Sequence, residues 1–147
     1  MALQYVISTG SVAMVLGTAK TLIEAPSSST VPYLVYKMEI SCAISSGANL
    51  IITWNNYTVS GTGTTVTPLK WGVDQSVAAI MGTVKVANSA EAGAWTVLTT
   101  LLIPLPGMYS IIDPFGRETY VPISTLRSLR GTASVAGNVA VNLYVEQ

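Results

Sequence analysis

The sequence predicts an all-β protein: an antiparallel, jelly-roll-like sandwich of about eight or more strands, with residues 1–147 forming a single domain. Two observations carry this prediction. Nearly every stretch alternates with a period of two residues and is rich in Val, Ile, Thr and Tyr, which suit a pleated, half-buried surface. Short clusters of Gly, Pro and Ser separate these stretches, as turns do in a sandwich or barrel. The length of 147 residues fits one domain.

The expected strands follow the alternating stretches in chain order. They are Gln4–Ser8, Val12–Leu16, Lys20–Glu24, Tyr33–Ile44, Ala48–Tyr57, Thr64–Lys70, Gly82–Ala87, Trp95–Ile103, Glu118–Val121, Leu126–Ala133 and Val139–Glu146. Residues 1–20 are expected to form either an arm or an edge strand. The Gly/Pro/Ser clusters at 25–32, 45–47, 60–63, 104–107, 113–116 and 136–138 are expected to be turns.

The stretch from Tyr33 to Tyr57 is expected to be a long hairpin. In its first strand Leu34, Tyr36, Met38, Ile40, Cys42 and Ile44 form the more apolar face, so this face should point into the core. Leu50, Ile52 and Trp54 lie on one face of the second strand. Antiparallel pairing with one buried face fits this pattern.

The charge balance limits the kinds of partner. Seven Lys and Arg residues oppose seven Asp and Glu residues, and only 10% of residues are charged while 50% are hydrophobic. A neutral chain lacks the basic stripe that binds nucleic acid and the basic cluster that binds anionic membranes. A chain with so few charges and no net charge is poorly protected against self-association. We therefore expect other copies of the chain or a partner to cover much of its surface.

The residues for common active sites are missing from the sequence. It has no histidine, which excludes Ser-His-Asp and Cys-His catalysis and the usual zinc sites. Cys42, the only cysteine, is expected to be a small buried hydrophobic residue. The Gly-x-Gly of "SGTGTT" joins two strands and opens no helix, so it is expected to be a hairpin loop. We therefore expect no enzyme activity, no catalytic residues, no cofactor and no metal.

One stretch contains a cluster of charged residues in a chain that otherwise has few. "IIDPFGRETYVPISTLRSLR" contains Asp113, Arg117, Glu118, Arg127 and Arg130. Asp113 and Glu118 are the only carboxylates close together in the sequence, and we expect the Asp113, Arg117 and Glu118 side chains to fasten a tight turn by charge-assisted hydrogen bonds. Arg127 and Arg130 are expected to face a neighbouring chain. Trp71, which follows a strand, is expected to be exposed and to add a further contact.

Four pieces of sequence, taken in order, carry a resemblance. They are "KMEISCAISSGANLIITW", "GTGTTVTPLKWGVDQSVAAIMGTV", "PFGRETYVPISTLRSLRGTAS" and "GNVAVNLYVEQ". From Ile40 to Gln147 their order and spacing resemble the decoration or cement proteins of tailed-phage virions, which are jelly-roll-like β-sandwiches. The stretch "LRSLRGTAS" departs from the more apolar strand of that family, because it adds two arginines.

The resemblance implies a structural role without catalysis. Such proteins sit on the outside of an assembled phage head, often as trimers, and stabilise contacts between major capsid protein subunits. The resemblance implies a protein made in the host cytoplasm and carried on the outer surface of the virion. The N-terminal residues themselves have no basic residue before Lys20 and no continuous apolar core, so we expect no export signal. The expected contacts are Asp113, Arg117, Glu118, Arg127, Arg130 and Trp71, together with residues before Lys20. Two alternatives stay open: a head-fibre, tail or baseplate protein of the virion, and a surface carbohydrate-binding module with an exposed Trp/Tyr platform.

Overall fold

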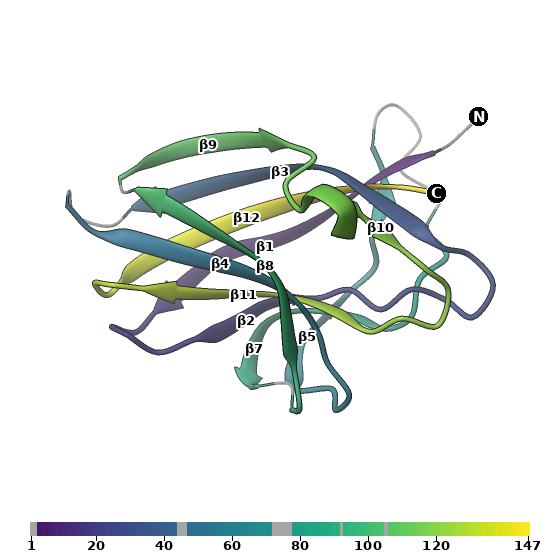
Figure 1. Ribbon diagram of the computed structural model, residues 1–147, viewed down its shortest axis with the longest axis horizontal. Coiled ribbons are helices and arrows are strands. Elements are labelled where there is room, and N and C mark those ends of the chain that lie inside the picture. The colour runs from purple at the N-terminus through teal and green to yellow at the C-terminus, as the bar shows by residue number, and fades with distance from the viewer. Residues whose placement is uncertain (1–2, 44–46, 72–77, 92, 105) are drawn as a thin grey trace.

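The computed structural model describes residues 3–43, 47–71, 78–91, 93–104 and 106–147, and it is a β-sandwich of two six-stranded sheets (Figure 1). Sheet A contains β1 (Gln4–Met14), β3 (Tyr33–Ala43), β6 (Leu69–Lys70), β9 (Gly107–Ile112), β10 (Tyr120–Val121) and β12 (Gly137–Glu146). Sheet B contains β2 (Lys20–Glu24), β4 (Asn49–Asn56), β5 (Thr62–Val66), β7 (Val84–Ala90), β8 (Thr96–Pro104) and β11 (Arg127–Ala133). The predicted all-β class and two-layer sandwich are confirmed.

All the strand pairs are antiparallel. Sheet A has the order β10-β3-β12-β1-β6, and β9 pairs with β3 on the same edge as β10. Sheet B has the order β5-β7-β2-β11-β4-β8. A 3-10 helix, η1 (Gly116–Thr119), separates β9 from β10. No helix in the described ranges is long and apolar enough to cross a membrane.

The predicted hairpin between Tyr33 and Tyr57 is wrong, because its two strands belong to different sheets. β3 pairs with β12, β9 and β10 in sheet A, while β4 pairs with β11 and β8 in sheet B. The alternating pattern shows that each strand has one buried face, but it does not show which strand lies beside which. The link between β3 and β4 therefore crosses from one layer to the other.

The N-terminal residues form one continuous strand, where the sequence predicted two strands within an arm or edge strand. β1 pairs with β12 along its length, with a register shift between Ser8 and Ser11. Gly10 lies in this shift with a φ of 63°, a left-handed conformation that glycine adopts without strain. The sequence break at Thr9–Gly10 is thus a β-bulge inside a strand, not a turn between strands.

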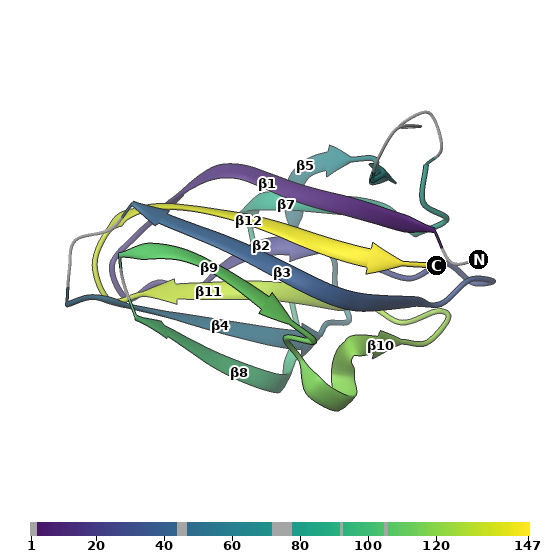
Figure 2. The same cartoon turned by 90° about the horizontal axis from the view of Figure 1, so that it is seen from above.

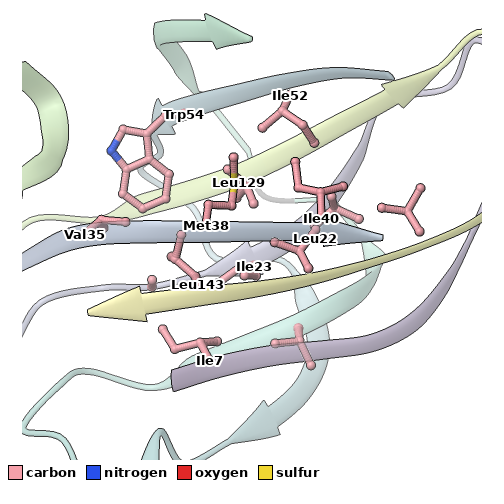
Figure 3. Packing of buried hydrophobic residues seen from close by; sticks show 14 of the residues in the cluster. Ile7, Leu22, Ile23, Val35, Met38, Ile40, Ile52, Trp54, Leu129 and Leu143 are labelled. Atoms are coloured by element: carbon pink, nitrogen blue, oxygen red, sulfur yellow. The ribbon is translucent and has the colours of Figure 1, made fainter. Parts of the chain in front are cut away.

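The core lies between the sheets and is built from aliphatic and aromatic side chains of both layers (Figure 3). Its largest fully buried members are Trp54, Tyr33, Phe115, Ile7, Leu22, Ile23, Met38, Ile40, Leu50, Ile52, Leu129 and Leu143. The predicted inward positions Leu50, Ile52 and Trp54 on β4 are confirmed. Cys42 is buried as predicted, and burial raises the pKa of its thiol to about 11.

The inward face of β3 changes side within the strand. Met38, Ile40 and Cys42 are buried as predicted, but before them Tyr33 and Val35 are buried in place of Leu34 and Tyr36. The register with β12 shifts between Tyr144 and Val145, so Tyr36 is an extra residue on β3. An extra residue inverts the alternation on one side of it, which a strict period of two does not anticipate.

Candidate functional site

The charged segment that the sequence singled out forms the connection from β9 through η1 to β11. The Asp113 amide donates to the Tyr36 carbonyl at 3.0 Å, and the Gly116 amide donates to the Asp113 carbonyl at 3.3 Å. Asp113 and Gly116 have φ angles of 46° and 54°. The side chains of Asp113 and Arg117 are exposed, and the side chain of Glu118 lies outside the described part of the structure. Main-chain hydrogen bonds therefore close this tight turn.

Phe115 anchors this turn to the core. Its ring stacks on the ring of Trp54 with centroids 4.5 Å apart and an interplanar angle of 2°. Both side chains are fully buried. The sequence analysis did not predict that Phe115 is buried, because Phe115 stands in a Pro/Gly turn outside any alternating stretch. The sequence signal for its burial was that it is the one phenylalanine of the chain.

The side chains of Arg127 and Arg130, which we expected to face a neighbouring chain, are buried among residues of this chain. They are 5% and 6% exposed, and they point to opposite faces of sheet B because they stand three residues apart on β11. The Arg127 Nη1 donates to the Asn56 Oδ1 at 2.6 Å. The Arg130 guanidinium lies 3.7 Å from the Trp95 ring centre, and its Nη2 is 3.3 Å from Glu91 Oε2.

Two loops cross the outer face of sheet B and cover the polar side chains that the sheet presents there. One loop joins β4 to β5 and the other joins β7 to β8. The two loops pair with each other through Val59 and Gly93. Glu91 fastens the second connection, since its carboxylate accepts hydrogen bonds from the Thr21 amide and from Arg130. This arrangement explains why Arg130 is buried on an outer face.

The buried carboxylate of Glu24 fastens the first connection. It accepts hydrogen bonds from the Ser60 hydroxyl at 2.6 Å, the Gly61 amide at 2.7 Å and the Asn88 side-chain amide at 2.6 Å. Lys85 Nζ donates to the Ser60 Oγ at 2.7 Å. The Ser60 hydroxyl thus donates to Glu24 and accepts from Lys85, and this group anchors the loop between β4 and β5. The sequence did not single out this cluster.

Trp71 is exposed as predicted, at 53%, and belongs to a cluster on the outer face of sheet A. Its ring meets the Tyr144 ring edge-on, with centroids 5.4 Å apart. The Tyr144 hydroxyl donates to Glu39 Oε2 at 3.1 Å, and Lys37 Nζ lies 2.5 Å from Glu39 Oε1. The hydrogen bond from Lys37 holds the pKa of Glu39 below its ordinary value. Beside Glu39 lies a hollow of about 340 Å³, lined also by Ser41, Ser110 and Asn142.

On one side of the sandwich β8 ends sheet B and β9 lies at the edge of sheet A (Figure 2). We call this side, formed by β8 and β9, the open side. Between Glu91 and Asp113 the sequence has no charged residue. Leu102 and Met108 are 64% and 84% exposed there, and Val97 and Ile112 are exposed too. Edge strands carry free main-chain donors and acceptors, so this side can bind another chain through both backbone and apolar contacts.

The six predicted contact residues do not form one surface. Trp71 lies over sheet A, Arg130 lies under the connections that cover sheet B, and Asp113 and Arg117 lie in the turn next to the open side. The prediction that these residues touch another chain stays a prediction. Sequence reasoning missed the open side, although the long run without charges after Glu91 was its visible signal.

Comparison with known proteins adds no family to this description. The chain matches no protein-family model, and a search of curated proteins gives no significant match.

Proposed function

We propose that this chain is a structural virion protein that binds the outside of an assembled phage head and stabilises contacts between major capsid protein subunits. The observation that carries the proposal is the open side, which exposes uncharged edge strands and apolar side chains that a free monomer would be expected to protect. The sequence resemblance to decoration and cement proteins supplies the finer placement, including the jelly-roll type of sandwich and the outer capsid surface.

The proposed mechanism is stabilisation by mass action. A protein that binds only the assembled shell shifts the equilibrium away from rupture by an amount set by its concentration over its dissociation constant. The chain acts as a homo-oligomer, and each oligomer engages several capsid subunits at once. Modest contacts then suffice, because the second and third contacts form at high effective concentration. The proposal involves no nucleic acid, membrane or cofactor.

The proposal is tested by sedimenting the purified chain with heads that lack it. We expect saturable binding to assembled heads and no binding to unassembled capsid subunits. Met108→Lys on the open side should weaken head binding at least about tenfold, because it places an unpaired charge in an apolar contact. Val135→Lys, in the exposed turn between β11 and β12, is the matched control and should bind as the original chain does.

Two results contradict the proposal. One is no binding to heads under conditions where the chain is folded. The other is binding that Met108→Lys and Val135→Lys change equally, because the open side would then have no special role. Binding to tails or baseplates instead of heads would support the alternative placement in the virion.

A second candidate function, carbohydrate binding, is favoured by the cluster around Trp71. An exposed indole, the Tyr144 ring and the polar hollow beside Glu39 and Asn142 supply a stacking surface and hydrogen-bonding groups for sugar hydroxyls. We expect a glycan array to show binding that Trp71→Ala removes while the melting temperature stays unchanged. A silent array would remove this candidate.

A further inference from the structure

The edge of sheet B at β8 is the longest open strand edge of the molecule within the described residues. β8 spans Thr96–Pro104 and pairs on one side only, with β4. Its register with β4 is continuous from Thr99 to Pro104, after a shift that leaves Leu98 as an extra residue. This regular segment carries no charge, and its outward residues Thr100 and Leu102 are exposed. It therefore presents a flat strand that can accept another strand.

The opposite edges carry the features by which proteins prevent such pairing. At the far edge of sheet A, β6 has only two residues, one of them Lys70, and it covers only Tyr5 and Val6 of β1. The rest of the β1 edge carries the β-bulge between Ser8 and Ser11. At the far edge of sheet B, β5 has five residues, and its register with β7 shifts between Thr62 and Thr64. Short strands, lysines, prolines and bulges are the usual protections of an edge. β8 has no charge, its one bulge lies before Thr99, and its one proline, Pro104, is the last residue of the strand.

We propose that the β8 edge of one copy pairs antiparallel with the β8 edge of a second copy, across a two-fold axis normal to sheet B. A second copy fits this edge because a two-fold contact uses the same residues twice, and an uncharged strand opposes itself without repulsion. Antiparallel pairing also continues the pattern of every strand pair in both sheets. The product is one continuous sheet shared by two copies.

The inference rests on the proposed function only in taking the open side as a contact surface. It assigns the two halves of that side differently, with β8 to the second copy and β9 to the capsid. It also gives a dimer in solution in place of the trimer that the family resemblance implies. The two proposals are therefore measured separately, by mass in solution and by sedimentation with heads.

The test is the mass of the purified full chain by sedimentation equilibrium. We expect a species of twice the 15.4 kDa of one chain. Thr100→Lys and Thr100→Glu should each weaken the dimer at least about tenfold, because the two-fold brings the two like charges close together. A mixture of the two variants should dimerise again, because opposite charges then face each other. Thr65→Lys, an exposed threonine on the far edge of the same sheet, is the matched control and should leave the dimer unchanged.

Each other outcome overturns the inference. A monomer at micromolar concentration, a species of three times the chain mass, or a dimer that Thr100→Lys leaves intact excludes pairing through β8. Failure of the mixed variants to re-form a dimer excludes a two-fold contact at this strand. Circular dichroism of each variant separates loss of pairing from loss of folding. A chain that dimerises but does not bind phage heads contradicts the proposed function and leaves this inference standing.

Discussion

The residue that does most to place the charged segment is Phe115, an aromatic side chain among charged neighbours. Its stacking on Trp54 ties the turn after β9 to the core of sheet B, and the Thr99 hydroxyl reaches the Phe115 carbonyl at 3.5 Å. Burial of two large rings face to face contributes more than exposed charge pairs do. The turn that borders the open side is therefore held by the core.

Phe115→Ala should destabilise the fold strongly. Removing a buried aromatic side chain leaves a cavity and costs about 3–5 kcal/mol. We expect a fall of this size in the free energy of unfolding, measured by urea titration with tryptophan fluorescence. Phe115→Leu is the control and should lose less, because leucine fills part of the site. A loss under about 1 kcal/mol for Phe115→Ala would show that the turn is not anchored through this ring.

Cys42 makes a prediction about high pH. Burial raises the pKa of its thiol from 9.0 to about 11, so the unfolded chain ionises first as the pH rises. The folded state then binds more protons than the unfolded state, and stability is lost between pH 9 and 11. A shift of this size corresponds to about 2–3 kcal/mol once both states are ionised.

The measurement is the free energy of unfolding across this pH range. The original chain should lose more stability than Cys42→Ala, in which tyrosine and lysine ionisation remain but the thiol does not. Equal slopes for the two proteins would show that the thiol ionises alike in the folded and unfolded states.

At the scale of elements, the sequence predicts which stretches are strands better than it predicts their partners. Most of the alternating stretches became strands, but β3 and β4 went to different sheets and β9 was missed. Alternation reports one buried face of a strand, while pairing depends on contacts between residues far apart in the chain. The sequence analysis missed β9 because its outward residues Met108 and Ile112 are apolar. A strand with one solvent-exposed face normally alternates polar and apolar residues, and these two residues obscure that alternation.

The same limit explains the two arginines of β11. A charged residue in a strand is expected to face solvent, and sequence alone does not reveal that two distant connections cross the outer face of sheet B. Glu91 and Trp95 meet Arg130 only through that crossing. The side chain of Glu24 is buried by the same arrangement.

Glu24→Ala should loosen the connection between β4 and β5. It leaves the Gly61 amide and the Asn88 side chain without their acceptor, and each unsatisfied buried group costs about 1–3 kcal/mol. We expect faster hydrogen exchange at the Gly61 amide and a fall in the free energy of unfolding. Glu24→Gln keeps a side-chain oxygen as acceptor and should recover part of both. Unchanged exchange at Gly61 in Glu24→Ala would contradict the anchoring role.

At the scale of the whole molecule, several charged side chains bond to other groups of the same chain, while the strands of one side carry no charge. Lys37 pairs with Glu39, Arg130 with Glu91, and Lys85 reaches Glu24 through Ser60. The open side has no such groups between Glu91 and Asp113. A neutral molecule with one uncharged side is suited to repeated contacts in an assembly, where its neighbours supply the covering that charges supply elsewhere.

A low-resolution reconstruction of the virion tests this account most directly. We predict additional density on the outside of the head, sized for this sandwich and repeated over the shell, with the open side turned toward its neighbours. Heads assembled without the protein should lack this density and rupture more readily on heating. A virion without this protein on the head, or one in which β8 and β9 face open solvent, would contradict the account.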